Sequence, residues 1–293
     1  MKKTAFVTYA FKPELTLDDA VVLRHLPEGV VEAVPWDAAG VDWAKFDAVV
    51  LRSCWDYHLR IDEFRGWLAR LEADGARLYN DFSTVRRNTD KFYLRDLTAA
   101  GIRTIPTVWI EQNAACSLAE TLRARGWRKA VVKPAVSATA FETRLADIET
   151  ARALQPAVDA MLRRAGVLVQ PFVEEIVAHG EFSFVFFDKK YSHAVLKRAK
   201  SGDFRVQSDF GGVVERVEPP AAFVEQAREV LDFVPEDLLY ARVDGVEIGG
   251  KFFLMELELI EPQLFLSLSE NAARRFAAAI LDKIDLLQQK IND

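Results

Sequence analysis

The stretch 242-RVDGVEIGGKFFLMELELIEP-262 contains two apolar runs that are joined by a pair of glycines. Adjacent glycines between strand-like runs are typical of a two-residue β-turn, because glycine adopts the positive φ angles that such turns require. With Gly249 and Gly250 as the turn, Ile248 pairs with Lys251. The sequence therefore predicts an antiparallel hairpin near the end of the chain.

Acidic residues interrupt this hairpin. Glu256 and Glu258 share one face of the second strand, because strand side chains alternate. Counting back from the turn puts Asp244 nearly opposite Met255, and a shift of one residue in register would set it directly across from Glu256. Clustered carboxylates repel one another when buried, and one or two Mg²⁺ ions would remove the repulsion. The alternative is an exposed face with salt bridges, and Arg242 lies on the same face as Asp244.

Two lysines stand where a nucleotide bound with Mg²⁺ would need cations. Lys133 ends the apolar run 129–134 and precedes the polar, glycine-free loop 135–144. Lys91 falls in the first turn of a helix predicted over 88–101. A solvated surface position is the alternative for each lysine. The run 167–175 predicts a strand that either ends in the core or forms a hinge against an adenine ring.

Strand and helix patterns alternate over the first 85 residues in the order β-α-β-β-α-β, which predicts a small, mostly parallel sheet. Downstream, the patterns predict strands at 105–110 and 129–134, a helix at 117–126 and a long helical segment at 145–166 with Pro156 as a candidate break. The chain closes with a helix from residue 270. The overall class is α/β.

Composition excludes several functional classes. The chain has 293 residues, a net charge of −6 and only two cysteines, which argues against nucleic acid as a partner and against a disulfide framework. No apolar stretch is long enough to span a membrane, and the first residues read as a strand and not as a signal peptide. We therefore expect a cytoplasmic protein with no membrane or nucleic-acid partner.

A polar and aromatic cluster, Arg52, Trp55, Asp56 and Tyr57, follows the predicted buried strand that ends near residue 51. In open α/β sheets the carboxyl ends of strands are the usual ligand side. The cluster is either an ion pair with packed aromatics or a substrate pocket in which Arg52 takes a carboxylate and Asp56 an amine. Farther along, His58 and His193 are expected to be structural, and Lys197 shares a strand face with His193 and could reach a phosphate.

Four elements, in order, resemble those of the ATP-grasp superfamily. They are "NTDKFYLRDLTAAGIRTIP" for the first lysine, "AVVKP" for the second, "VLVQPFVEE" with Glu181 for the adenine hinge, and "RVDGVEI…FLMELELIEP" for the metal hairpin. The match covers residues 86–285. Within the superfamily, "VVLRSCWDY", "NTDKFYLRDL" and "YSHAVLKRAKSGDFRVQSDFGG" are most similar to the bacterial group that includes the D-cycloserine-forming cyclo-ligase, which acts on O-ureido-D-serine. Glutathione synthetase and the ligases that add glutamate to ribosomal protein tails are more distant.

The resemblance implies a role for each matching residue. ATP would bind Lys91, Lys133, Ser137, Gln170, Phe172, Val173 and Glu181, with Glu174 and Glu175 competing for the ribose. Arg205, Arg242 and Lys197 would act on the phosphates or the anionic substrate, and Asp244, Glu256 and Glu258 would bind Mg²⁺ or Mn²⁺. Two positions depart from the family pattern: Glu258 stands where asparagine is usual, and the phosphate loop lacks glycine, so that Ser137 and Thr139 would supply hydroxyl donors instead.

The predicted protein is an ATP-grasp ligase that activates a carboxylate of a small amino-acid-like substrate as an acyl phosphate for a nitrogen nucleophile. One molecule would supply both groups if the enzyme cyclises its substrate. A small-molecule kinase and a non-catalytic nucleotide-binding protein are the alternatives. We expect an N-terminal α/β domain over 1–86, a central ATP-grasp lobe over 87–171, a C-terminal lobe over 172–293, and a dimer.

Overall fold

The computed structural model describes residues 2–200, 205–206 and 211–292, and its strands form three separate sheets. The N-terminal sheet is parallel, in the order β2-β1-β3-β4, and contains β1 (Thr4–Thr8), β2 (Val31–Pro35), β3 (Ala48–Leu51) and β4 (Leu78–Tyr79). The predicted alternation of strands and helices in this region is confirmed.

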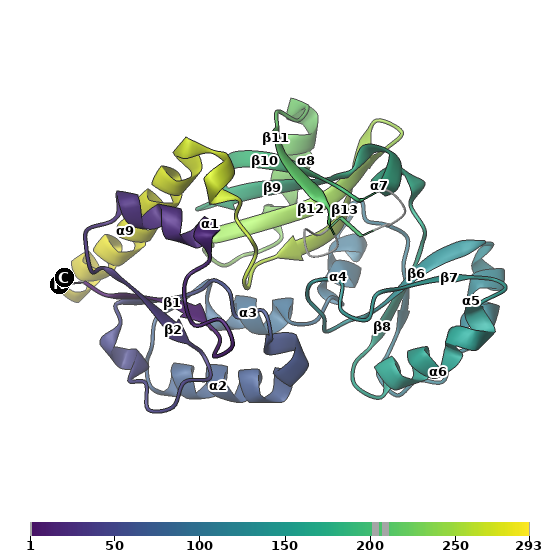
Figure 1. Ribbon diagram of the computed structural model, residues 1–293, viewed down its shortest axis with the longest axis horizontal. Coiled ribbons are helices and arrows are strands. Elements are labelled where there is room, and N and C mark those ends of the chain that lie inside the picture. Colours follow the sequence, from purple (N-terminus) through teal and green to yellow (C-terminus); the bar gives the residue numbers. More distant parts are fainter. Residues whose placement is uncertain (1, 201–204, 207–210, 293) are drawn as a thin grey trace.

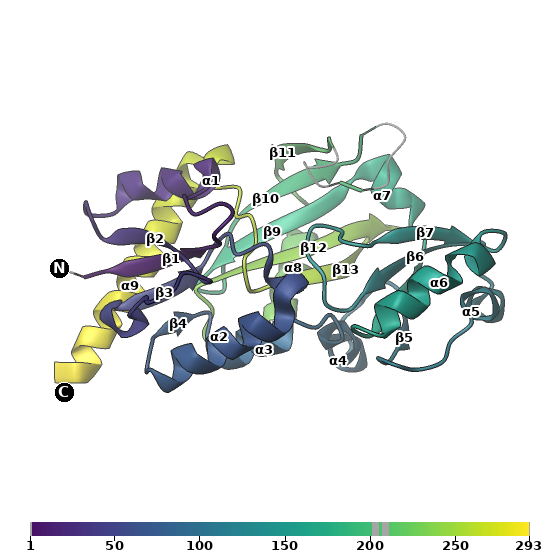
Figure 2. The ribbon, with the colours of Figure 1, turned by 60° about the horizontal axis from the view of Figure 1, so that its bottom comes forward.

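Both faces of the N-terminal sheet are covered, as expected for strands without alternating polarity. Helix α2 (Ile61–Ala73) packs against one face through Phe64 and Leu68. The other face packs against α9 (Glu270–Asn292), which crosses it through Phe276 and Ile280 (Figure 2). The last helix of the chain therefore helps to build the core of the first sheet.

The central sheet is antiparallel, in the order β5-β8-β6-β7, and is backed by two helices (Figure 1). Its elements are β5 (Val108–Ile110), α5 (Leu118–Arg125), β6 (Lys129–Pro134), β7 (Arg144–Asp147), α6 (Ala151–Leu162) and β8 (Val167–Pro171). The prediction of one long helix over 145–166 was wrong at its start, where β7 pairs with β6. Pro156 does not break α6, because buried Val158, Met161 and Leu162 anchor the following turns in the core.

The C-terminal sheet is antiparallel, in the order β11-β10-β9-β12-β13. It consists of β9 (Glu181–Phe187), β10 (Lys190–Arg198), β11 (Val213–Val217), β12 (Tyr240–Ile248) and β13 (Lys251–Glu258). The turn at Gly249 and Gly250 and the pairing of Ile248 with Lys251 are confirmed. The sequence analysis did not predict α7 (Glu174–His179) or α8 (Ala221–Asp232), and α8 packs on this sheet.

The helix predicted over 88–101 is confirmed only in its second half, as α4 (Tyr93–Ala99), and its predicted start was wrong. Helix α3 (Phe82–Asn88) ends before α4 (Tyr93–Ala99) begins, and Lys91 lies in the link between them. The backbone N–H of Lys91 donates to the Ala135 carbonyl at 2.9 Å, across to the segment after β6. This long-range bond takes the place of a helical one, so Lys91 is not in a first helical turn.

Candidate active site

A cavity of about 290 Å³ lies between the β12–β13 hairpin and the central sheet. Its walls contain every residue predicted for ATP, metal or phosphate, and from the N-terminal cluster Trp55 and Tyr57. The predicted residues in the walls are Lys91, Lys133, Ser137, Gln170, Phe172, Val173, Glu181, Lys197, Arg205, Arg242, Asp244, Glu256 and Glu258. Arg52 and Asp56 are not among the lining residues.

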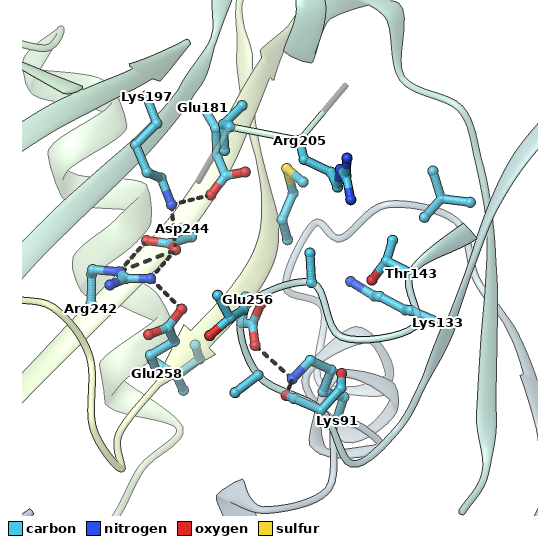
Figure 3. Close-up of a pocket in the computed structure, with 18 of the residues that line it drawn as sticks. Lys91, Lys133, Thr143, Glu181, Lys197, Arg205, Arg242, Asp244, Glu256 and Glu258 are labelled. Carbon is cyan, nitrogen blue, oxygen red and sulfur yellow. Dashed lines mark hydrogen bonds and ion pairs between the residues drawn. The ribbon is translucent and has the colours of Figure 1, made fainter. Parts of the chain in front are cut away.

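A β-bulge sets the register of the acidic hairpin. The pairing shifts between Asp244 and Gly245, so that Asp244 pairs with Glu256 and Arg242 with Glu258. A glycine is required at the bulge, because a Cβ atom on Gly245 would lie 2.3 Å from the Phe253 carbonyl oxygen. The one-residue shift that the sequence left open is therefore present, and it brings the three carboxylates together on one face (Figure 3).

Arg242 and Lys197 neutralise the most buried of these carboxylates. The Asp244 side chain, 2% exposed, accepts from Arg242 at 2.9 and 3.0 Å and from Lys197 at 2.9 Å. Burial alone would raise the pKa of Asp244, but the two cations outweigh it and hold that pKa well below its usual range. Lys197 also pairs with Glu181, and Arg242 also pairs with Glu258 (Figure 3).

The two glutamates of β13 face the cavity, with 29% of the Glu256 side chain and 24% of the Glu258 side chain exposed. Glu256 pairs with Lys91 at 2.8 Å, and the pKa of Glu256 is lowered because Lys91 and Lys133 outweigh the effect of burial. At Glu258, burial dominates over the attraction of Arg242 and raises the pKa to about 8. The pKa of Glu256 is therefore lowered and that of Glu258 is raised, although both side chains lie on the same face of β13.

Lys133 points into the cavity from the end of β6 (Figure 3). Within the part of the chain that the structure describes, it has no hydrogen bond or ion pair, in contrast to Lys91 and Lys197. Burial lowers the pKa of Lys133, opposed by the attraction of Glu256. The side chain is half-buried, and a partly desolvated ammonium without a carboxylate partner is suited to bind an anion.

The opposite wall is largely apolar. Gln170, Pro171, Phe172 and Val173 run along it from the end of β8, near Ile105 and Met255. The Gln170 amide donates to Thr107 at 2.9 Å, and the Lys129 ammonium lies 3.8 Å from the centre of the Phe172 ring. Of the three glutamates considered for ribose, Glu181 lines the cavity, whereas Glu174 and Glu175 do not.

The loop after β6 closes one side of the cavity. Its residues Thr139, Ala140 and Glu142 adopt positive φ angles although none is glycine, which strains the backbone. The Ser137 hydroxyl donates to the Pro134 carbonyl at 3.1 Å, and the Ser137 carbonyl accepts from Lys91. Ser137 thus stabilises the loop itself, and Thr143 is a lining residue that the sequence analysis missed.

The segment after β13 supplies further lining residues that were not predicted, namely Ile260, Glu261, Gln263 and Phe265. Burial raises the pKa of Glu261 to about 7. Strand periodicity ends at Glu258, so alternation along the sequence gave no signal for these positions.

Arg52 and Asp56 have the ion-paired arrangement that was one of the two alternatives for the N-terminal cluster. Arg52, 1% exposed, bonds Asp19 at 2.8 and 2.9 Å and the Pro262 carbonyl at 3.0 Å. Asp56 accepts from the Trp36 indole at 2.9 Å and pairs with Arg60. Because these partners take up both charged groups, the structure does not bring either residue to the cavity as a free substrate ligand.

A second hollow adjoins the first and is lined by Lys12, Glu14, Asp18, Asp19, Arg52 and Ser53, among others. Trp55 and Gln263 line both spaces and therefore lie at their junction. Two buried polar atoms here, Asp18 Oδ2 and Ser53 Oγ, lack a hydrogen-bond partner. Most buried polar atoms in folded proteins have a hydrogen-bond partner, and a polar group of a ligand in this hollow would be one such partner.

The residues present fit a divalent cation only in part. Among the described residues no group of three His, Cys, Asp or Glu side chains is arranged to hold a metal as it stands. Glu256 and Glu258 offer oxygens to the cavity, and Mg²⁺ commonly takes only one or two carboxylates together with phosphate and water. Asp244 is enclosed by Arg242 and Lys197, so its predicted role as a metal ligand is not visible in this arrangement.

Comparison with known proteins identifies the family. Residues 4–80 match the family model described as the N-terminal domain of D-cycloserine synthetase DcsG. The cycloserine biosynthesis protein DcsG of Streptomyces lavendulae is 33% identical over 268 residues, which cover 86% of this chain and 88% of that protein. The chain belongs to the DcsG family of ATP-grasp ligases.

Solved structures agree with the DcsG assignment. The crystal structure of D-cycloserine synthetase DcsG matches with a TM-score of 0.86 at 30% identity, covering 96% of this chain and 99% of the other. D-alanine–D-alanine ligase from Bacillus anthracis, complexed with ATP, matches with a TM-score of 0.71 at 16% identity over 99% of both chains. At that identity the second match shows the fold alone.

The predicted ATP-grasp fold and the resemblance to the DcsG group are therefore confirmed, and this DcsG-family chain is an ATP-dependent ligase. Among the described helices, none combines the length and the apolar character that a membrane span requires. The substrate and the roles of individual residues belong to the proposal that follows.

Proposed function

We propose that this DcsG-family ligase activates the carboxylate of a small amino-acid-like substrate as an acyl phosphate and joins it to a nitrogen nucleophile. The observation that carries the proposal is Lys133, a half-buried cation without a carboxylate partner among the described residues, in a cavity whose other lysines have carboxylate partners. An anion is the missing partner, and ATP phosphates supply it in an ATP-dependent ligase.

The adenine would lie along Gln170, Phe172 and Val173, with Glu181 near the ribose. The phosphates would then extend toward Lys91, Lys133 and Arg205. Mg²⁺ held by Glu256 and Glu258 would neutralise charge on the transferred phosphoryl group. Arg242 lies beside Glu258 and would stabilise the same charge as it develops.

The second hollow would hold the amino-acid end of the substrate. Asp18 Oδ2 is buried and unpartnered, so it suits an ammonium group, and Ser53 Oγ offers a further polar contact. Trp55 and Gln263, at the junction, would let the substrate extend from this hollow into the cavity beside Arg242. The proposed substrate ligands are therefore Asp18 and Ser53, whereas Arg52, which also lines the hollow, is paired with Asp19, and Asp56 is paired with Arg60.

In the first chemical step a substrate carboxylate oxygen attacks the γ-phosphorus, and the bond to the bridging oxygen breaks to release ADP. In the second step the nitrogen attacks the acyl carbon. The carbon–oxygen bond to phosphate breaks, and the nitrogen loses one proton to the departing phosphate. Lys91, Lys133 and Arg242 stabilise the phosphoryl charge in the first step by fixed positive charge.

The 33% identity to a cycloserine biosynthesis protein favours an intramolecular variant, in which one amino acid supplies both the carboxylate and the nitrogen. O-ureido-D-serine is the first compound to test. A cyclised product would have lost its free carboxylate without gaining a second substrate molecule.

The experiment is a screen for substrate-dependent ADP release with Mg·ATP, with O-ureido-D-serine and a panel of D- and L-amino acids, followed by product analysis. We expect ADP, phosphate and a product with a new carbon–nitrogen bond. Asp18→Asn should raise KM for the amino acid and leave ATP affinity unchanged. A stable phosphorylated product would instead establish a kinase, and no ADP release with any carboxylate would reject the proposal.

A further inference from the structure

A row of side-chain donors holds the irregular segment that follows β13. Each consecutive backbone carbonyl from Leu259 to Leu264 accepts a hydrogen bond from a side chain elsewhere in the chain. The donors, in order of the carbonyls, are Asn80 (2.8 Å), Tyr240 (2.6 Å), Trp55 (3.2 Å), Arg52 (3.0 Å), Arg242 (3.0 Å) and His193 (3.0 Å).

This arrangement has a physical cause. Buried backbone carbonyls must be paired, and outside a strand or helix the partners have to be side chains. Leu259, Ile260 and Leu264 are at most 3% exposed, and the segment has no sheet partner after Glu258. The donors come from β10, β12 and the ends of β3 and β4, so the segment is fixed from the N-terminal and C-terminal sheets together.

His193, like Asn80 and Tyr240, lines neither the cavity nor the second hollow, and its bond to Leu264 lies next to a residue that does line the cavity, Phe265. Its Nε2 donates to the Leu264 carbonyl, and its Nδ1 therefore accepts from the Ser192 hydroxyl at 3.0 Å. A break in the pairing of β10 with β9 lies between Tyr191 and His193. The ring is 3% exposed, so it reaches bound ligands only through the backbone that it holds.

Leu264 connects this bond to the phosphoryl site. The next residue, Phe265, has a positive φ of 52° and lines the cavity, with the Arg242 guanidinium 5.6 Å from its ring centre. The preceding carbonyl, of Gln263, accepts from Arg242 itself. Arg242 in turn pairs with Asp244 and Glu258.

We infer that His193 is a positioning residue for the ligase reaction. It fixes the Leu264 carbonyl, and through Gln263 and Phe265 it sets where the Arg242 guanidinium lies. The inference rests on the proposed role of Arg242 in stabilising the transferred phosphoryl group. Loss of the Nε2 donor should lower kcat and leave nucleotide affinity unchanged, because the adenine wall and Lys133 are on the far side of the cavity.

Two substitutions of His193 distinguish loss of the Nε2 hydrogen-bond donor from loss of the imidazole ring as a whole. His193→Gln keeps an amide N–H near the position of Nε2, whereas His193→Asn reaches only the position of Nδ1. With the substrate found in the ADP-release screen, we expect His193→Asn to lower kcat about tenfold, as small misplacements of catalytic groups do. We expect His193→Gln to restore most of kcat. His25→Asn, at an exposed site, is the matched control.

A double-mutant test asks whether the effect passes through Arg242. If it does, His193→Asn should lower kcat less than about twofold when Arg242 is already replaced by Lys, because effects of coupled residues are not additive. Hydrogen exchange at the Leu264 and Phe265 amides gives a readout that needs no substrate, and it should be faster in the Asn variant than in the Gln variant. A failed ADP-release screen would therefore reject the proposed function, while hydrogen exchange would still test whether His193 fixes the Leu264 carbonyl.

Equal kcat losses in the Gln and Asn variants would overturn the positioning role. Fully additive losses of kcat on combining His193→Asn with Arg242→Lys would also overturn it. So would exchange at the Leu264 and Phe265 amides that is equally fast in the Asn and Gln variants. A fall in melting temperature with kcat preserved would show that His193 serves the fold alone.

Discussion

Replacing Lys133 by Met should have opposite effects on stability and on nucleotide affinity. Lys133 is a half-buried cation without a carboxylate partner among the described residues, and desolvation lowers its pKa. A lysine whose pKa is lowered in the folded state makes its charged form cost stability at neutral pH. Methionine has a similar length and no charge, so the melting temperature of the nucleotide-free protein should stay the same or rise.

Nucleotide binding should weaken at the same time. Removing one charge-assisted hydrogen bond to a phosphate costs about 1.5–3 kcal/mol, which is roughly a 10- to 150-fold increase in Kd. At an ATP concentration of about one hundred times the wild-type Kd, the ligand stabilises the wild type by about 2.7 kcal/mol. A variant with a Kd about thirtyfold higher gains only about 0.9 kcal/mol at that concentration.

The assay compares melting curves with and without Mg·ATP, and calorimetry gives Kd directly. Lys251→Met, at an exposed position on the hairpin, is the control and should leave the ligand-induced shift unchanged. The reasoning is refuted if Lys133→Met lowers the stability of the nucleotide-free protein and keeps the wild-type Kd. That result would mean that Lys133 has a stabilising partner in the fold and no role at the phosphates.

Three further predictions concern the hairpin and His193. Glu256→Gln should lower the melting temperature of the nucleotide-free protein, because Lys91 loses its carboxylate partner. Glu258→Gln should preserve or raise the melting temperature, because burial raises the pKa of Glu258 to about 8. If these residues bind the metal, both variants should also reduce the Mg²⁺-dependent rise in melting temperature. Gly245→Ala should lower the free energy of unfolding, measured by urea titration, by about 2 kcal/mol through overpacking against Phe253. The control is Gly66→Ala, inside α2, where the added Cβ atom has its nearest contact at 3.5 Å; this variant should leave the free energy of unfolding unchanged or raise it. Burial lowers the pKa of His193 from 6.5 to about 4, against a smaller opposing effect of the Leu264 carbonyl and Asp18, and so keeps the ring neutral. As the pH drops from about 6.5 to about 4, the unfolded state binds a proton at this histidine before the folded state does, so the free energy of unfolding should fall. His193→Gln should lose less stability than the wild type over that range. Equal pH dependence in wild type and variant would contradict this assignment.

The turn and the polarity of the hairpin could be predicted from the sequence, because both are local. Gly249 and Gly250 specify the turn, and the alternation of Glu256 and Glu258 specifies the face. The bulge is different, because it depends on contacts across the sheet. Asp-Gly inside a strand is compatible with either register, and only the close approach of the Phe253 carbonyl to Gly245 shows which one the fold adopts.

Long-range partners decide what local patterns could not. Lys91 fitted a helix by local pattern, but its N–H is bonded to Ala135, a residue that no local window contains. Arg52 follows a buried strand, where both an ion pair and a substrate ligand were open, and its partner Asp19 comes from elsewhere in the same domain. In both cases the residue type and its place at the end of an element were read correctly, and a distant partner decided what the side chain does.

The charge pattern of the cavity links these observations to the proposed reaction. In the nucleotide-free protein, Lys91, Lys197 and Arg242 pair with the carboxylates that were predicted to hold a metal or the ribose. Mg·ATP carries both complementary partners, a cation for Glu256 and Glu258 and anions for the lysines. If it binds as proposed, Lys91 exchanges Glu256 for a phosphate as Glu256 exchanges Lys91 for Mg²⁺. Among the lysines of the described cavity, Lys133 then gains a charged partner only when ATP binds, whereas Lys91 and Lys197 have carboxylate partners already. This difference makes Lys133 the lysine for which the gain on binding ATP should be largest.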